Sequence, residues 1–91
     1  MQGVIFPNPA SGPSVQVQVS GLTTTTKVSL QIFTTAMRKV SEQTYHSQGP
    51  GTVTLTLSLT DSTGVALANG VYYVVIRADN QRTTLKLMVL R

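Results

Sequence analysis

The feature that most constrains the fold of this chain is strict alternation of apolar and polar residues. Apolar residues occupy every second position in three runs, at residues 15–19, 28–32 and 53–59. Successive side chains of a β-strand point to opposite faces, so each run predicts a strand with one buried and one solvated face. Val, Ile and Thr, whose branched side chains suit a pleated sheet, make up about a third of the residues. No helical period is longer than one turn.

Four further runs complete the predicted set of strands, at residues 4–6, 38–45, 71–78 and 83–90. Turn signals rich in Gly, Pro, Asn, Asp and Ser separate the runs, at residues 8–13, 20–21, 49–51, 61–64 and 69–70. Thr23–Thr26 is interpreted as a strand entrance or a loop, and Leu67 as a loop residue that plugs the core. The pattern predicts an all-β fold, an antiparallel Ig or fibronectin III-like β-sandwich of about seven strands, with residues 1–91 as a single domain.

The last two runs predict a closing hairpin with a loop at Asn80-Gln81. In that register one face of the ribbon is almost wholly apolar, with the pairs Ala78–Thr83, Ile76–Leu85, Val74–Leu87 and Tyr72–Val89. The other face holds the pairs Val71–Leu90, Tyr73–Met88, Val75–Lys86 and Arg77–Thr84. We expect the first face to lie in the core, because a slip of one residue would mix the two faces.

The second face of the hairpin is the candidate functional surface. An apolar patch on the outside of a sheet often marks a contact surface. We therefore predict a protein-interaction site formed by Val71, Tyr73, Val75, Met88 and Leu90, with Lys86 and Arg91 at its rim. The alternative is that neighbouring loops, or the strand at residues 4–6, cover these side chains.

Catalytic and cofactor chemistry is not expected. The chain has no Cys, which excludes disulfides and thiolate sites, and its single His46 is interpreted as a solvated loop residue. Asp61 and Asp79 lie at turns, where a carboxylate caps backbone N–H groups. The sequence contains no nucleophile motif and no phosphate loop, and its few carboxylates make a poor metal site. We expect no enzyme activity, no cofactor and no bound metal.

Charge and hydropathy limit the classes of partner. The formal net charge of +4 reflects seven cations against three acids, and only Arg38 and Lys39 are adjacent bases. Phosphate backbones need several cations on one face, so we do not expect nucleic-acid binding. No apolar run reaches the roughly 18–20 residues that span a bilayer, so no membrane span is expected.

Two stretches carry a family resemblance. The first is a short strand that enters a Pro-Asn-Pro bend near the start, Val4-Ile5-Phe6-Pro7-Asn8-Pro9. The second begins with the turn Asp61-Ser62-Thr63-Gly64, continues with a strand that starts at Gly70-Val71-Tyr72, and ends in Lys86-Leu87-Met88-Val89-Leu90-Arg91. Together they resemble the C-terminal β-sandwich tails of exported bacterial proteins, including type IX secretion sorting domains. They are equally similar to the Ig-like domain of flagellar hook-capping proteins. The likeness spans almost the whole chain.

The chain departs from the family pattern in two places. Where the family often has Asp-Leu-x-Gly-Arg, this chain has Thr34-Thr35-Ala36-Met37-Arg38, so that the glycine of the turn is replaced. Before its Asp-x-x-Gly turn the hook-cap branch commonly has an aromatic residue, Asp and Gly, whereas this chain has Leu57-Ser58-Leu59-Thr60. Both departures weaken the likeness to the flagellar protein and favour a module of a larger exported or surface protein.

The resemblance implies a non-catalytic interaction module at the C-terminus of a larger exported or cell-surface bacterial protein. Its function would be docking, surface attachment or secretion sorting, and its partner the preceding domain or a secretion or surface protein. The alternative is an assembly scaffold of the hook-cap type, which would self-associate or bind filament subunits.

Overall fold

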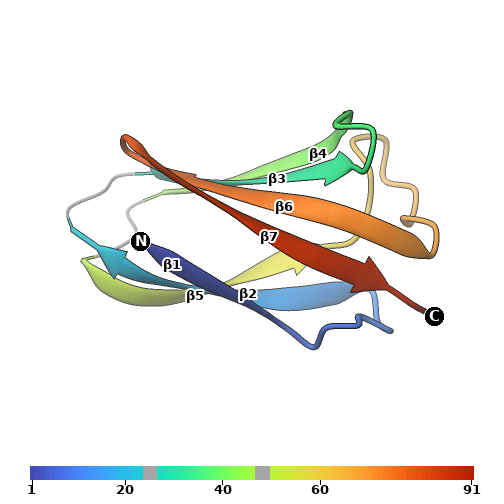
Figure 1. The fold of residues 1–91 in the computed structure, drawn as a ribbon, viewed down its shortest axis with the longest axis horizontal. Helices are drawn as coiled ribbons and strands as arrows, with labels where there is room; N and C mark the ends of the chain where they lie inside the picture. Colours follow the sequence, from blue (N-terminus) through green and yellow to red (C-terminus); the bar gives the residue numbers. More distant parts are fainter. Residues whose placement is uncertain (24–26, 47–49) are drawn as a thin grey trace.

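The computed structural model describes residues 1–23, 27–46 and 50–91 and contains seven strands packed as two layers (Figure 1). The strands are β1 (Gln2–Phe6), β2 (Ser14–Leu22), β3 (Lys27–Thr34), β4 (Lys39–His46), β5 (Gly51–Ser58), β6 (Gly70–Ala78) and β7 (Gln81–Val89). One sheet has the order β1-β2-β5 and the other the order β4-β3-β6-β7, and all strand pairs are antiparallel. The predicted all-β sandwich is confirmed, and its arrangement is compatible with an Ig or fibronectin III-like fold.

The core lies between the two sheets and is built from the alternating apolar positions. The side chains of Val17, Leu30 and Ile76 are fully buried, as are most inward residues of β2, β3 and β6. Leu67 is 6% exposed and packs into the same cluster from the loop before β6, as predicted. The Tyr72 hydroxyl donates a hydrogen bond to the Ala68 carbonyl at 2.7 Å, so a half-buried ring keeps its polar end satisfied.

The turn predicted at Ser20-Gly21 is wrong, because β2 continues through these residues to Leu22. The pairing with β5 shifts between Val19 and Leu22, and Gly21 has a φ of 75°. A glycine in the left-handed region is typical of a β-bulge, which bends a strand without ending it. Residues 24–26 of the predicted threonine loop and residue 49 of the predicted Gly49–Gly51 turn lie outside the described residues.

The register predicted for the closing hairpin is also wrong, by two residues. Ala78 pairs with Gln81 and Tyr73 with Lys86, so the two-residue loop consists of Asp79 and Asn80. Asp79 has a φ of 54°, a left-handed conformation that Asp tolerates better than most residues. A slip of two residues keeps every side chain on its face, so the predicted inner and outer faces are retained.

The β3–β4 hairpin closes through a turn that requires a left-handed residue. The Met37 N–H donates to the Thr34 carbonyl and the Thr34 N–H to the Arg38 carbonyl, both at 2.9 Å. Met37 has a φ of 63° and is 60% exposed. This geometry matches a type I turn followed by a left-handed bulge residue, a position that favours glycine. Met37 therefore stands where the family often has glycine, at the position of this turn that favours glycine.

The N-terminal segment joins the two sheets along one side of the sandwich. After β1, a bend with cis peptide bonds before Pro7 and Pro9 leads the chain to the free edge of β7. There the Ala10 N–H donates to the Met88 carbonyl at 2.7 Å, and the Leu90 N–H donates to the Ala10 carbonyl at 2.8 Å. No helix in the described ranges is long and apolar enough to cross a membrane.

Candidate functional surface

The residues predicted to form an interaction site lie on the outer face of β6 and β7, away from the core. Val71 is opposite Met88, Tyr73 opposite Lys86, and Val75 opposite Thr84. These pairs differ from the predicted ones, but the same side chains share the face. Leu90 and Arg91 follow the end of β7. The structure thus brings Val71, Tyr73, Val75, Lys86 and Met88 together on one face of the ribbon.

The exposure of these residues separates the set into two groups. Val75 is only 5% exposed, because its neighbours Gln31 on β3 and Thr84 on β7 shield it on both sides. Val71 and Tyr73 are half-buried, whereas Met88 is 38% and Leu90 is 57% exposed. Val75 is therefore covered by its neighbours. The exposed part of the surface is formed by Lys86, Met88 and Leu90, and Val71 and Tyr73 are partly exposed beside them.

The strand at residues 4–6 does not cover this surface. It is part of β1 in the other sheet, and its outward Val4 and Phe6 side chains are themselves 56% and 43% exposed. The nearest aromatic neighbour on the surface is instead Phe33, the β3 partner of Tyr73. The sequence analysis missed Phe33, although its alternation with the buried Ile32 places it on the outer face.

Asn8 of the Pro-Asn-Pro bend borders the surface at the edge of β7. Its side-chain amide donates to the Lys86 carbonyl at 2.9 Å, and its side-chain oxygen accepts from the Met88 N–H at 3.1 Å. The amide thereby substitutes for one residue of a neighbouring strand. An open hollow of about 300 Å³ lies here, lined by Asn8, Pro9, Lys86 and Met88.

Arg91 is held by the loop that precedes β6. The Asn69 side-chain oxygen accepts from the Arg91 N–H at 3.0 Å, and the Asn69 amide donates to the Arg91 carbonyl at 3.2 Å. The Arg91 guanidinium also donates to the Leu67 carbonyl. These bonds direct Arg91 toward the loop and give it a structural role, whereas its place at the rim of an interaction surface stays a prediction.

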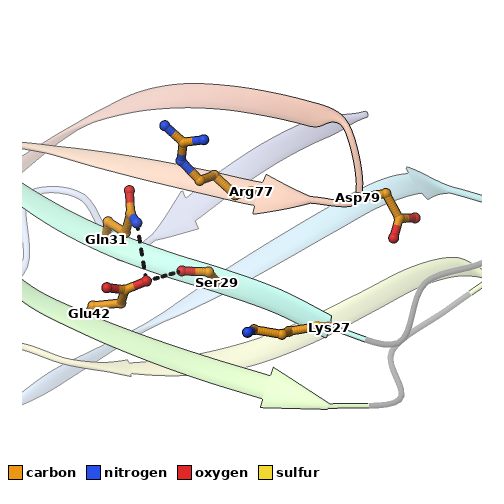
Figure 2. Close-up of a pocket in the computed structure, with 6 residues that line it drawn as sticks. All are labelled: Lys27, Ser29, Gln31, Glu42, Arg77 and Asp79. Carbon is orange, nitrogen blue, oxygen red and sulfur yellow. Dashed lines mark hydrogen bonds between the residues drawn. The ribbon is translucent and has the colours of Figure 1, made fainter.

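A polar hollow of about 360 Å³ lies on the same sheet, nearer the β6–β7 turn (Figure 2). On its β3–β4 side the Glu42 carboxylate accepts hydrogen bonds from Lys39 at 2.8 Å, Ser29 at 3.0 Å and Gln31 at 3.1 Å. The Lys39 hydrogen bond, followed by those from Gln31 and Ser29, lowers the pKa of Glu42 to about 2. Its negative charge is therefore already satisfied within the sheet.

The histidine and the two aspartates considered in the sequence lie in three different elements. His46 is exposed, as predicted, but it is the last residue of β4 and not a loop residue, because the strand ends one residue later than predicted. Asp61 caps its own turn, as predicted, since its carboxylate accepts from the Thr63 N–H at 2.9 Å and the Val65 N–H at 3.0 Å. The Thr63 hydroxyl, which also donates to it, is the main cause of its lowered pKa. Asp79 is the first residue of the β6–β7 loop.

Arg77 and Arg82 form a pair that the sequence analysis missed. They are direct cross-strand partners on the outer face of β6 and β7, and both are exposed. The predicted register placed Arg77 opposite Thr84, which separated the two arginines. In the described ranges no group of three or more His, Asp or Glu residues lies close enough together to hold a metal ion.

Comparison with known proteins identifies the family. Residues 4–90 match the family model described as "Secretion system C-terminal sorting domain". Among solved structures, the dimeric latent PorU from Porphyromonas gingivalis matches with a TM-score of 0.70 and 20% sequence identity, over 97% of this chain and 9% of that chain. No curated protein matches the chain significantly. At this identity the PorU likeness shows the fold alone, and neither match is to a hook-capping protein.

Proposed function

The chain belongs to the secretion system C-terminal sorting domain family, and on that premise we propose that it sorts its parent protein by docking through the outer face of β6 and β7. As a sorting domain it is part of an exported, cell-surface protein. The match over residues 4–90 supports our further proposal that residues 1–91 form a single module at the C-terminus of a larger chain. The partner would be a component of the secretion apparatus or of the cell surface.

The observation that supports this docking face is its composition. Tyr73, Met88 and Leu90 are apolar side chains with exposed surface on one ribbon, and Lys86 lies among them. Aromatic residues and Met are enriched at protein–protein interfaces relative to the rest of the surface. Burying them against a partner would remove apolar area from water and stabilise the complex.

The sorting role is tested by fusing residues 1–91 to the C-terminus of an inert reporter in a host that has the matching secretion system. We expect the reporter to reach the cell surface or medium. A fusion that stays inside the cell, while a fusion with an established sorting domain is exported, would contradict the sorting role.

The docking face is tested by changing Tyr73 and Met88 to Ser in the same fusion. We expect export to fall, while the melting temperature of the isolated chain changes by only a few degrees. The matched control changes Val4 and Phe6 to Ser, since these exposed apolar residues lie on the opposite sheet. Equal loss of export in both variants would show that the face of β6 and β7 has no special role.

A further inference from the structure

Of the two sheets, only one carries charged residues. Strands β1, β2 and β5 contain no charged residue. The other sheet and its turns hold six cations and two acids, which leaves +4, the whole formal charge of the chain. These residues are Lys27, Arg38, Lys39, Arg77, Arg82, Lys86, Glu42 and Asp79, and all eight are exposed. Asp61 and Arg91 lie outside both sheets, and their opposite charges cancel in the net charge.

The cations on β6 and β7 are available to a partner. Lys39 is paired with Glu42 at 2.8 Å, whereas in the described part of the chain Arg77 and Arg82 have no hydrogen bond or ion pair with one another or with an acid. Like charges directly opposite on neighbouring strands destabilise a sheet. With Cα atoms about 5 Å apart, however, two guanidinium groups can bind one carboxylate or two adjacent ones.

The polar hollow shows where such a carboxylate could enter. Arg77 rises from β6 on the side opposite Glu42, which comes from β4 (Figure 2). Two acids line the hollow with Arg77: Glu42, which is bonded by Lys39, Gln31 and Ser29, and Asp79 in the loop at the end of the hairpin. In the described residues no hydrogen bond or ion pair joins the Arg77 guanidinium to Glu42, whose carboxylate is already bonded by other side chains.

The same ribbon continues from the arginine pair to the apolar docking residues. Beyond Arg77 and Arg82 come Val75 with Thr84, then Tyr73 with Lys86, then Val71 with Met88. A membrane surface would require a continuous set of protruding apolar side chains, whereas here Met88 and Leu90 are exposed, Val71 and Tyr73 are half-buried and Val75 is buried. A second copy would bring two faces of like charge together. A protein surface can offer carboxylates and apolar side chains at the required places.

We propose that the outer face of β6 and β7 docks on an acidic surface of another protein, with Arg77 and Arg82 binding its carboxylates and Tyr73 and Met88 packing beside them. This inference rests on the proposed sorting function and specifies the chemistry of its partner. It predicts that binding weakens as salt rises, because exposed charges are screened.

The test titrates the isolated chain with short poly-L-glutamate at low ionic strength, with amide chemical shifts and calorimetry as readouts. We expect the largest shifts on β6 and β7. The double variant R77Q with R82Q should bind about tenfold more weakly, at about threefold for each exposed ionic contact. The control Q18E with T52E makes the same change in net charge on the uncharged sheet. If local contacts on β6 and β7 determine binding, the affinity of this control for poly-L-glutamate should stay within about twofold of the wild-type value.

Three results would overturn the inference. Equal weakening in both double variants would show that net charge alone attracts the probe. Tighter binding to phosphatidylglycerol vesicles than to poly-L-glutamate, lost in R77Q with R82Q, would indicate a membrane surface. Full export of the reporter fused to R77Q with R82Q would show that the arginines do not serve sorting. In that last case the sorting role stands, whereas a wild-type fusion that is not exported would refute the sorting role itself.

Discussion

Replacing Met37 with Gly should stabilise this protein. Met37 has a φ of 63° in the β3–β4 turn, where the left-handed conformation crowds its Cβ. Relief of that crowding is worth roughly 1–2 kcal/mol. The added freedom of glycine in the unfolded chain offsets about 0.4–1 kcal/mol of it. The Met37 side chain is 60% exposed, so little packing is lost.

The net gain expected is about 0.5–1 kcal/mol in the free energy of unfolding. For a domain of this size, each kcal/mol raises the melting temperature by about 4–8 °C, so M37G should melt about 2–8 °C higher than the wild type. Thermal unfolding followed by circular dichroism, and urea titration at fixed temperature, measure the change independently. The slope of the urea titration should be unchanged, because the surface exposed on unfolding is the same.

Two matched variants isolate the backbone effect. Met37→Ala removes the long side chain but keeps a Cβ at a positive φ, so its stability should be close to that of the wild type. Ala36→Gly, one residue earlier and outside the left-handed region, should be less stable by about 0.5–1 kcal/mol. If M37G is no more stable than the wild type, or loses as much as A36G, the argument from left-handed strain is refuted.

Three further predictions follow from particular contacts. Asn8→Ala removes two hydrogen bonds to β7 and should lower the free energy of unfolding by about 1–3 kcal/mol in urea titration, and Asn8→Asp, which keeps the acceptor for the Met88 N–H but turns a second acceptor toward the Lys86 carbonyl, should cost no less. Gly3→Ala would put a Cβ 2.6 Å from the buried Ile76 side chain and should cost about 1 kcal/mol, whereas Gly12→Ala, with nothing within 4 Å, should cost less. Folding lowers the pKa of Glu42 from 4.5 to about 2, so the ionised carboxylate stabilises the folded state. This contribution to the free energy of unfolding should be fully present above pH 4.5 and be lost as the pH falls from 4.5 to about 2. At this exposed site it should be under about 1 kcal/mol and absent in Glu42→Gln, and a carboxyl NMR titration midpoint near 4.5 would contradict it.

The inner face of each strand could be predicted because alternation is a local property. Val15, Val17 and Val19 are all buried, and so are Val28, Leu30 and Ile32. A strand that buries one face fixes the parity of its side chains, since a slip of one residue would place every apolar group in water. The all-β class and the candidate face of β6 and β7 followed from this pattern.

Alternation could not determine the register of the closing hairpin. A slip of two residues preserves parity, so the choice between a loop at Asn80-Gln81 and one at Asp79-Asn80 rests on turn geometry and on neighbouring strands. The observed register brings Arg77 opposite Arg82, the pair on which the inferred acidic partner depends. It also places Val75 between Gln31 and Thr84, which bury a residue predicted to be part of the open surface.

The alternation of apolar and polar residues was enough to predict which side chains face inward and that the fold is a sandwich of strands. The tertiary structure alone decided which outward side chains are neighbours, how deeply each is covered, and that all the net charge lies on one sheet. The two kinds of information differ in how far apart in the sequence the residues that determine them lie. Side-chain alternation is set by the geometry of each strand, whereas pairing between strands depends on residues that are distant in the chain and meet only in the folded protein.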